Sequence, residues 1–566
     1  MKTILINVIS PSEKYFFDFT VEETELPLGL EYLSSSLKEN GFSNELYNII
    51  PGKIINSELF SKLNKDELIL FGLPLYSNNV DQSLCIALKI KEIYPNSHIT
   101  VGGHLVTNVP VEILRDHKFI DSAVIGYGEK TIVEIAEHLK GGQDFGDIPG
   151  IAYRNEEQVM YNLAHRFDDS LDEIPFPRRV NYKSQSFNTA RMVSSRGCYY
   201  LCKYCTTPAF LNNSNTKKKW SGRSVDNIVI EMEQLVKEDQ IRQVIFCDDN
   251  FINKGKSSRE KGNKLADSII QKELKLKFWI MTRVDCYDKN DDDFVLHLKR
   301  AGLWGIFLGL ETGSTKVIED LNKRTTIEKN IETARLFKRN NIMIEVGFIN
   351  FYPTSTTQDL LDNLELLYQL NEANYFNYFS NKLQLYPGIH LIHELRKKGL
   401  LVENYNYKKT DGYKFEHPEV FELYKTVKFV ASKLRSHDLI IWNYKRLYQI
   451  TVELVNFKEN NESNTVLTNL ISARDAIYSC LSEVNTINYN FMLKYLDTNL
   501  NKSSKSNLMN AHLEAVNIAI DKTIVPLVSL FEIKDYLLPS LDKTFLEEFF
   551  KSSLYQRIDE KEYCYG

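Results

Sequence analysis

Apolar and polar positions along the first 140 residues predict strands separated by helices. The short apolar runs lack the every-second-residue alternation of a half-exposed strand, as expected in a parallel sheet that helices cover on both faces. The predicted strands are Ile4–Ile9, Ser43–Ile49, Leu68–Leu73, Ile99–Gly102 and Ser122–Gly126. The predicted helices are Leu28–Asn40, Val80–Ile93 and Lys130–Leu139. We therefore expect a doubly wound, Rossmann-like α/β domain over residues 1–140.

The following segment, residues 141–189, has a different character. Two short runs, Ile151–Tyr153 and Val159–Tyr161, are typical of a hairpin. Further on, Ile174–Pro177 contains two prolines, which fix their own φ and restrain the residues before them. We interpret residues 141–189 as a linker that contains a hairpin.

Alternation of strands and helices resumes over residues 190–398. The predicted strands are Ala190–Ser194, Gln243–Cys247, Lys277–Thr282, Gly305–Leu310, Met343–Ile349 and Tyr378–Leu385, with helices between them. Six such steps without a second break favour a partial parallel (β/α)6 barrel over another open sheet. In such barrels the chemistry occurs at the carboxyl ends of the strands.

The last part, residues 399–566, shows helical spacing without strands. The predicted helices are Glu419–Arg435, Leu439–Phe457, Thr465–Leu481 and Leu508–Phe531, and Pro418 suits a helix start. Tyr and Phe recur at helical spacing, which usually indicates core packing. Cys480 is expected to be a buried small hydrophobe, and Cys564 to lie in a frayed terminus. This mainly α-helical domain either caps the barrel and shapes the substrate pocket or is a packing appendage.

Composition limits the classes of partner. The chain has 566 residues, of which 43% are hydrophobic and 25% charged, so it is an ordinary globular protein. A net charge of −6 provides no basic surplus for nucleic acid. No apolar stretch approaches a membrane span, and the first apolar run is too short for a signal peptide, so we expect a cytoplasmic protein.

Three of the eight cysteines lie within eight residues: Cys198, Cys202 and Cys205, spaced Cys-x3-Cys-x2-Cys after a predicted strand. Three thiolates on one loop can hold three irons of a [4Fe–4S] cube and leave the fourth iron open to a small molecule. One alternative is a structural zinc site, but zinc requires four protein ligands, and no Cys or His follows closely after Cys205. The other alternative is three unrelated buried cysteines.

This cysteine segment, with Tyr204 before the last cysteine, resembles the signature of radical S-adenosylmethionine (SAM) enzymes, and the resemblance continues over about residues 140–395. Gln243–Phe251 resembles the second strand of these enzymes with its acidic end, Gly309–Ser314 their fourth-strand motif, and Leu385–Gly388 the motif after their sixth strand. The resemblance implies that Cys198, Cys202 and Cys205 bind the cluster.

It also implies that SAM chelates the open iron and is cleaved to a 5′-deoxyadenosyl radical. Tyr204 and Glu311 would then help to seat SAM, and Asp248 is a further candidate contact to its ribose or amino group. A helix cap or a surface salt bridge is the alternative role for the two carboxylates.

The first domain resembles cobalamin-binding domains of the same superfamily. The matching pieces are Leu26–Leu30, Val101–His104 and Gly126–Glu129. The implied corrinoid contacts are Leu28, Tyr76, Ser77, Gly102, Gly103, His104, Gly126, Tyr127, Gly128 and Glu129. The Asp-x-His-x-x-Gly string that places a histidine beneath cobalt is absent. We therefore expect a lower face without histidine, covered by the loop that contains Tyr76 and Ser77, or else a degenerate domain that binds nothing.

By resemblance, the expected function is a cobalamin-dependent radical SAM enzyme that methylates an unactivated carbon of a small molecule or peptide. A reductant such as flavodoxin or ferredoxin would supply electrons. One alternative keeps the radical without methyl transfer, in a rearrangement, ring contraction, epimerisation or crosslinking. Another is a metal- or corrinoid-binding sensor without turnover.

Overall fold

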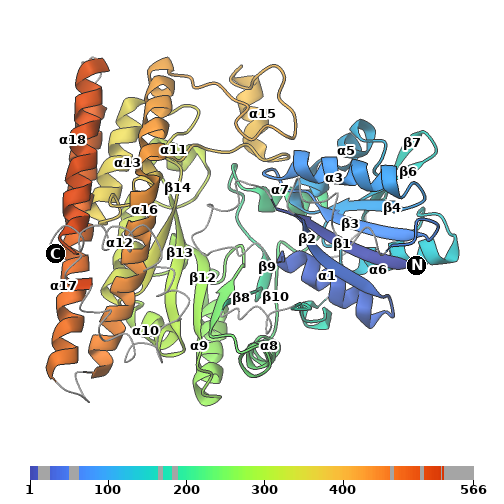
Figure 1. The fold of residues 1–566 in the computed structure, drawn as a ribbon, viewed down its shortest axis with the longest axis horizontal. Helices are drawn as coiled ribbons and strands as arrows, with labels where there is room; N and C mark the ends of the chain where they lie inside the picture. The colour runs from blue at the N-terminus through green and yellow to red at the C-terminus, as the bar shows by residue number, and fades with distance from the viewer. Residues whose placement is uncertain are drawn as a thin grey trace, which may run out of the picture. The chain divides into compact units, whose positions relative to one another are not determined.

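The computed structural model describes residues 1–9, 26–49, 63–162, 170–180, 189–458, 464–496, 502–523 and 526–527. The chain packs into two compact units, and Figure 1 labels the elements of both. The first comprises Met1–Phe251, Lys272–Leu276 and Gln384–Lys414. The second comprises Ile252–Gln271, Lys277–Leu383 and the described residues from Phe415 onward. Cys564 and residues 524–525 and 528–531 of the predicted helix Leu508–Phe531 lie outside the described residues.

The N-terminal part of the first unit is built on one sheet, in the order β2-β1-β3-β4-β5-β6-β7. Its strands are β1 (Lys2–Val8), β2 (Asn44–Ile49), β3 (Ile69–Pro74), β4 (His98–Gly102), β5 (Ser122–Val124), β6 (Ile151–Asn155) and β7 (Gln158–Asn162). The first five are parallel, and the β6–β7 hairpin pairs antiparallel with β5. The predicted hairpin therefore forms and extends this sheet.

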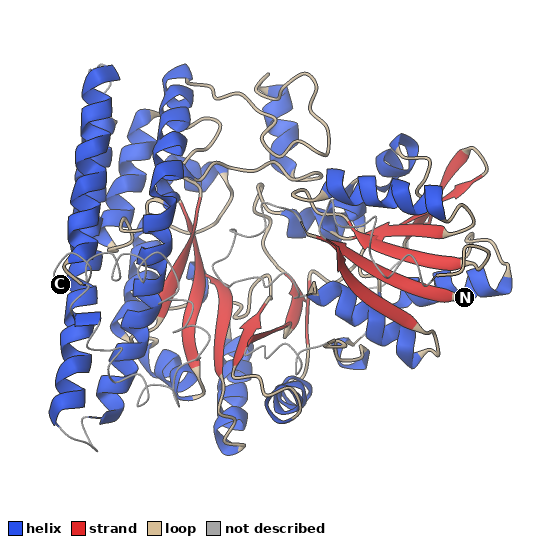
Figure 2. Cartoon of the chain, in the orientation of Figure 1, coloured by secondary structure: helices blue, strands red, loops and turns tan. Residues whose placement is uncertain are grey.

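Helices cover both faces of the sheet, as the apolar runs predicted (Figures 1 and 2). These helices are α1 (Leu28–Glu39), α3 (Val80–Ile93), α4 (His104–Asn108), α5 (Pro110–Asp116) and α6 (Glu129–Gly141). Alternate side chains of a strand point to opposite faces. Ile4 and Ile6 accordingly pack with α3, α4 and α5, whereas Leu5 packs with α1 and α6. The Rossmann-like fold is confirmed.

The rest of the first unit contains the cysteine segment. Its elements are η3 (Leu171–Glu173), β8 (Thr189–Met192), β9 (Ser195–Gly197), α7 (Thr206–Asn213), β10 (Trp220–Gly222), α8 (Val225–Lys237), β11 (Gln243–Phe246) and α15 (His390–Lys397). Strands β8 and β11 pair in parallel, and β9 pairs antiparallel with β10. The three cysteines therefore lie on the loop between β9 and α7.

The second unit continues the alternation of strands and helices. Its elements before the helical domain are α9 (Lys256–Gln271), β12 (Lys277–Arg283), η4 (Val284–Cys286), α10 (Asp292–Arg300), β13 (Leu303–Glu311), α11 (Thr315–Asp320), α12 (Ile327–Arg339), β14 (Met343–Phe348), α13 (Thr357–Gln369) and α14 (Asn377–Ser380). Strand β13 pairs in parallel with both β12 and β14. These elements provide the later β/α steps that the sequence predicted.

The predicted strand Tyr378–Leu385 is wrong. Helix α14 occupies its start, and Lys382 forms only an isolated bridge with Phe351. The Tyr378 hydroxyl accepts a hydrogen bond from the Val346 N–H at 3.1 Å. A side chain thus satisfies a backbone donor of β14 that a neighbouring strand would otherwise bond.

The C-terminal part consists of long helices that pack along one another, α16 (Pro418–Lys458), α17 (Asn464–Tyr495) and α18 (Lys502–Asp521), as Figure 2 shows. One helix forms where two were predicted over Glu419–Phe457, because residues 436–438 contain neither Pro nor Gly. The side chains of His437 and Asp438 form hydrogen bonds to other segments of the chain. His437 pairs with Asn517 at 2.9 Å, and Asp438 accepts the Phe376 N–H at 2.7 Å. Cys480 is buried in the core of this domain, as predicted.

Buried polar groups hold this helical domain to the segment that follows α13. Glu372 pairs with Lys338 of α12 at 2.5 Å and with Lys445 of α16. Asn488 of α17 donates to the Ala373 carbonyl at 2.7 Å. The two lysines hold the pKa of Glu372 below its usual value, although burial alone would raise it. Across the described residues, we find no helix long and apolar enough to cross a membrane.

Candidate functional site: a glycine-rimmed pocket beside the cysteine loop

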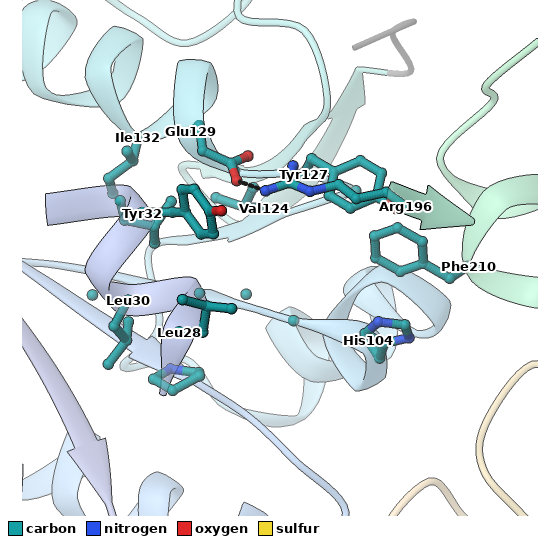
Figure 3. Close-up of a pocket in the computed structure, with 18 of the residues that line it drawn as sticks. Leu28, Leu30, Tyr32, His104, Val124, Tyr127, Glu129, Ile132, Arg196 and Phe210 are labelled. Carbon is teal, nitrogen blue, oxygen red and sulfur yellow. Dashed lines mark hydrogen bonds and ion pairs between the residues drawn. The ribbon is translucent and has the colours of Figure 1, made fainter. Parts of the chain in front are cut away.

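A cavity of about 310 Å³ lies within the first unit, where the carboxyl ends of β3, β4 and β5 meet residues that flank the cysteine loop (Figure 3). The predicted residues that line it are Leu28, Tyr76, Gly102, Gly103, His104, Gly126, Tyr127, Gly128 and Glu129. The cysteine-segment side contributes Val193, Ser195, Arg196, Phe210, Cys247 and Asp249. In open α/β sheets, ligands bind at this edge of the strands.

Glycines form the rim of this cavity. Gly103 and Gly126 have φ values of 105° and 84°, a region that side chains rarely adopt. A Cβ on Gly126 would also lie 3.0 Å from the Ser214 hydroxyl oxygen. The missing side chains leave backbone exposed to a large flat ligand and let α7 approach closely. This cradle fits a corrinoid.

A buried ion pair forms one wall. Arg196, directly before Gly197, donates to Glu129 at 2.5 Å, and its guanidinium lies 4.6 Å from the Tyr127 ring centre (Figure 3). Burial disfavours the charge on Arg196, but Glu129 outweighs burial and raises the pKa of the guanidinium. The motif residue Glu129 is thus bonded to the residue that leads into the cysteine loop.

Aromatic rings form another side of the cavity. His104 stacks on Phe210 of α7 with 4.4 Å between ring centres, and Tyr127 forms a T-shaped pair with the same Phe210 ring, with 5.0 Å between ring centres. The His104 side chain borders the cavity, as Figure 3 shows. Surrounding protein lowers the pKa of His104, so the imidazole is neutral at neutral pH.

The cysteine loop carries the thiols expected of a cluster site. Cys205 is the N-cap residue of α7, and its N–H bonds to the Cys202 carbonyl at 3.2 Å. Burial raises the pKa of the Cys205 thiol to about 12, so this thiol needs a metal to lose its proton. Within the described ranges, no three His, Cys, Asp or Glu side chains stand close enough to hold a metal ion. The three thiols share one short loop and are the donor type that an iron–sulfur cluster requires.

The two aspartates after β11 have different surroundings. Asp248 is 1% exposed and accepts hydrogen bonds from the Ser194 N–H at 2.7 Å and the Ser195 hydroxyl at 2.6 Å. These bonds tie β11 to the connection between β8 and β9. The neighbouring Asp249 lines the cavity instead. A ligand role for Asp248 remains a prediction, whereas the structure brings Asp249 to the site.

Glu311 lies in the second unit at the end of β13, where the strand bulges against β14. Its φ is 68°, a costly value for a residue with a side chain, and such strain is concentrated at functional sites. Its carboxylate is buried and pairs with the ammonium of Lys323. A Cβ on Gly309 would lie 2.6 Å from this carboxylate, so a larger residue there would displace the ion pair.

The remaining predicted contacts are less decisive. Ser77 is not among the residues that line the cavity, although Tyr76 beside it is. Tyr204 lies half-buried within the cysteine loop. Sequence reasoning missed Arg196, Phe210 and Asp249. Their positions beside the cysteine motif and beside Asp248 were the available signals.

Comparison with known proteins agrees with this geometry. The model of the Radical SAM superfamily matches residues 192–367, which include the cysteine loop and Glu311. Residues 192–367 of this chain therefore form a radical SAM domain. The model of the B12 binding domain matches residues 18–136, which form most of the glycine-rimmed cavity. This radical SAM enzyme therefore carries a cobalamin-binding domain at its N-terminus.

Curated relatives have several activities. An uncharacterized methyltransferase of Pyrococcus horikoshii is 24% identical over 365 residues, 64% of this chain and 77% of the relative. An anaerobic magnesium-protoporphyrin IX monomethyl ester cyclase of Cereibacter sphaeroides is 24% identical over 441 residues, 75% of this chain and 67% of the relative. The hopanoid C-3 methylase of Methylococcus capsulatus is 25% identical over 333 residues, 57% of this chain and 60% of the relative.

A solved structure has the same fold over nearly the whole chain. The cobalamin-dependent S-adenosylmethionine radical enzyme OxsB, with aqua-cobalamin and SAM bound, superposes with a TM-score of 0.67 at 17% identity. The match covers 97% of this chain and 83% of OxsB. The cofactors of this radical SAM enzyme are a [4Fe–4S] cluster, SAM and cobalamin, and the thiols and the glycine cradle fit them.

Proposed function

We propose that this chain is a cobalamin-dependent C-methyltransferase that acts on an unactivated carbon of a small molecule or peptide. The observation that carries the proposal is one cavity bordered both by glycine-rich strand ends and by Arg196, Phe210 and Asp249 beside the cysteine loop. A methyl donor and a radical generator must both reach the same substrate carbon, so adjacent cofactor sites suit this reaction.

The residues of this chain would hold and orient the reactants. When bound, the cluster and SAM supply a 5′-deoxyadenosyl radical, and cobalamin supplies the methyl group. Cys198, Cys202 and Cys205 would hold the cluster. Tyr204 and Glu311 would seat SAM, with Glu311 accepting from its amino group. The buried walls of the cavity exclude water, which would otherwise quench reactive species.

Further residues would shape the corrinoid site. The glycines at its rim leave room for the ring, and the neutral His104 can donate or accept one hydrogen bond without bringing a charge into the pocket. Tyr76 and Ser77 belong to the loop that we assign to the lower face. One-electron reduction of the cluster would come from a protein such as flavodoxin or ferredoxin.

Two relatives with methyltransferase or methylase in their names support methyl transfer. The cyclase relative supports the alternative, in which the radical drives a rearrangement, ring contraction, epimerisation or crosslinking without methyl transfer. Products of SAM separate the two, because methyl donation leaves S-adenosylhomocysteine and radical cleavage leaves 5′-deoxyadenosine.

The test uses anaerobically reconstituted full-length protein with SAM, a reductant and hydroxocobalamin. A methyltransferase produces both S-adenosylhomocysteine and 5′-deoxyadenosine, and the first depends on cobalamin. With substrate present, the product is heavier by one methylene unit. Formation of 5′-deoxyadenosine alone, with or without cobalamin, would contradict methyl transfer and favour the alternative. Absence of both would favour a sensor without turnover.

A further inference from the structure

The cysteine loop exposes two apolar side chains to solvent. Tyr199 is 54% exposed and Leu201 is 48% exposed, whereas Cys202 beside them is buried. The Tyr199 ring stacks on Trp220 of β10, with 5.9 Å between ring centres. Scattered apolar residues are common at protein surfaces, but these two lie between the proposed cluster ligands Cys198 and Cys202. The loop that would hold the cluster therefore has an accessible apolar side.

A run of three lysines lies directly against the start of this loop. Lys217–Lys219 are all exposed and precede Trp220. Strand β10 pairs antiparallel with β9, and Trp220 lies opposite Gly197. The Lys219 carbonyl oxygen approaches Gly197 so closely that a Cβ there would lie 2.3 Å from it. Because Gly197 directly precedes Cys198, the backbone of the lysine run contacts the residue that leads into the proposed cluster ligands.

The three lysines concentrate positive charge on a chain whose net charge is −6. Lys203, on the cysteine loop itself, is paired with Glu394 at 2.8 Å, so a carboxylate balances its charge. Charge of one sign that is clustered on a surface attracts molecules of the opposite sign and raises their rate of encounter. We call Tyr199, Leu201 and Lys217–Lys219 the basic–aromatic surface.

The position of the basic–aromatic surface indicates which anionic molecule it fits. A [4Fe–4S] cluster on the loop must take up one electron before SAM can be cleaved, and electron transfer between proteins slows steeply with distance. A donor protein therefore has to dock beside the loop. Electron-transfer proteins form small interfaces, and complementary charges steer their encounters. Three lysines next to two exposed apolar side chains meet these requirements, whereas an anionic membrane surface has no need of a place beside the cluster.

We propose that the basic–aromatic surface is the docking site for a small acidic electron-carrier protein. Carboxylates of the carrier pair with the ammonium groups of Lys217–Lys219, and its apolar contact area covers Tyr199 and Leu201. One electron then passes from the reduced carrier to the oxidised cluster, so the carrier is oxidised by one electron and the cluster is reduced by one. The inference rests on the cluster of the proposed function and not on methyl transfer.

The test uses reconstituted full-length protein and an acidic flavodoxin. Stopped-flow absorbance follows reduction of the cluster by fully reduced flavodoxin. Combining Lys217→Glu, Lys218→Glu and Lys219→Glu should lower the second-order rate constant about tenfold at low salt, the lower end of electrostatic steering. In about 1 M salt, where the Debye length is about 3 Å, the difference should vanish. The extent of cluster reduction by photoreduced deazaflavin, a small uncharged reductant that needs no docking, should stay unchanged.

Binding provides a second measurement that needs no turnover. Calorimetric titration with oxidised flavodoxin should give about tenfold weaker binding for the triple variant at low salt. Tyr199→Ser should weaken binding about fivefold and leave its salt dependence unchanged, because it removes apolar contact and no charge. The matched control combines Lys425→Glu, Lys428→Glu and Lys433→Glu, which reverse three exposed lysines of α16 and change the net charge by the same amount. This control should alter neither the rate nor the binding.

Circular dichroism and iron content check that each variant folds and takes up a cluster. If the triple variant of the lysine run fails either check, the same three positions changed to Gln decide by the same comparison. The proposal is overturned if the two triple variants slow flavodoxin equally, if neither does, or if Tyr199→Ser binds as the wild type does. Binding of phosphatidylglycerol vesicles through these lysines, without an effect on the flavodoxin rate, would assign the surface to a membrane and also overturn it. Failure of methyl transfer appears separately, as absence of S-adenosylhomocysteine while flavodoxin still reduces the cluster.

Discussion

Two of the regions that bury charged side chains do so in contrasting surroundings. In the first unit, Arg196 and Glu129 pair at the wall of a cavity. In the second unit, Glu372 pairs with Lys338 and Lys445 where the helical domain packs against the segment after α13. The first pair is bordered by glycines and stacked aromatic rings, whereas the second joins tightly packed helices.

The difference indicates what each buried charge contributes. A charge buried in packed protein is costly to leave alone, so its partners mainly hold the surrounding elements together. A charge buried at the wall of a cavity can still be contacted by a molecule in that cavity, and ligands bind at such places. On this basis, changes around the cavity should affect cofactors more than stability, and changes around Glu372 should do the reverse.

The largest expected effect is loss of the cluster. Cys202→Ala removes one of the three proposed thiol ligands from the loop and should reduce 5′-deoxyadenosine formation below detection, with iron content falling toward zero. The substitution leaves no buried charged side chain without its partner. The free energy of unfolding of the iron-free protein should therefore change by less than about 2 kcal/mol. Chromatography of the SAM products and chemical denaturation measure the two quantities. A variant that still cleaves SAM would contradict the proposal that the cysteine loop holds the iron–sulfur cluster.

On the structural side of the comparison, Glu372→Ala should destabilise the fold by about 3–5 kcal/mol, because it leaves two buried lysines without their partner. Cobalamin affinity should stay unchanged. Chemical denaturation measures the loss. The control is Glu422→Ala, which removes an exposed partner of Lys425 and should cost about 0–1 kcal/mol. Equal losses in the two variants would contradict the comparison.

The helical domain should also respond to pH through His512. This imidazole is buried between Phe376 and Phe491, beside His437, and burial lowers its pKa to about 3. The unfolded chain takes up a proton near pH 6.5 and the folded chain does not, so stability falls as the pH drops below 6.5. Between pH 6.5 and 5 the loss should be about 2 kcal/mol.

His512→Phe retains an aromatic ring and cannot titrate. Comparing the pH dependence of its unfolding free energy with that of the wild type isolates this one group. The variant should show a flatter dependence below pH 6.5. Parallel curves for the two proteins would rule out His512 as the source.

The smallest expected effect concerns the rim of the cavity. A Cβ at Gly102 meets Val124 at 3.7 Å, an ordinary contact, so Gly102→Val should fold while its side chain narrows the pocket. We expect cobalamin affinity to fall about tenfold, equivalent to about 1.4 kcal/mol. Equilibrium dialysis measures it. Gly41→Ala, which strains a turn away from the cavity, should leave the affinity unchanged.

The repeating patterns predicted much of the fold. Helix α3 has the predicted bounds, Val80–Ile93, because its apolar spacing and flanking polar residues are regular. The single helix α16 and the lost strand at Tyr378 were not predictable, because their outcome depends on distant partners such as Asn517 and Val346. Tertiary contacts override local pattern at such positions.

As with the fold, part of the candidate site could be predicted from the sequence and part could not. The cysteines were predicted from their spacing, and the glycines at the rim of the cavity from the resemblance to cobalamin-binding domains. The roles of Asp248 and Asp249 could not be separated, because adjacent residues after a strand point in different directions and only the folded chain shows which one faces the cavity. Arg196 and Phe210 contribute through contacts with residues far along the chain, which spacing does not reveal.

The central claim is that this chain holds a [4Fe–4S] cluster in which one iron has no protein ligand and can bind SAM. The most direct measurement is low-temperature EPR of the reduced, anaerobically reconstituted protein before and after SAM is added. The account predicts the signal of a reduced [4Fe–4S] cluster whose shape changes when SAM binds. A cluster signal that SAM leaves unchanged, or no cubane signal at all, would contradict it.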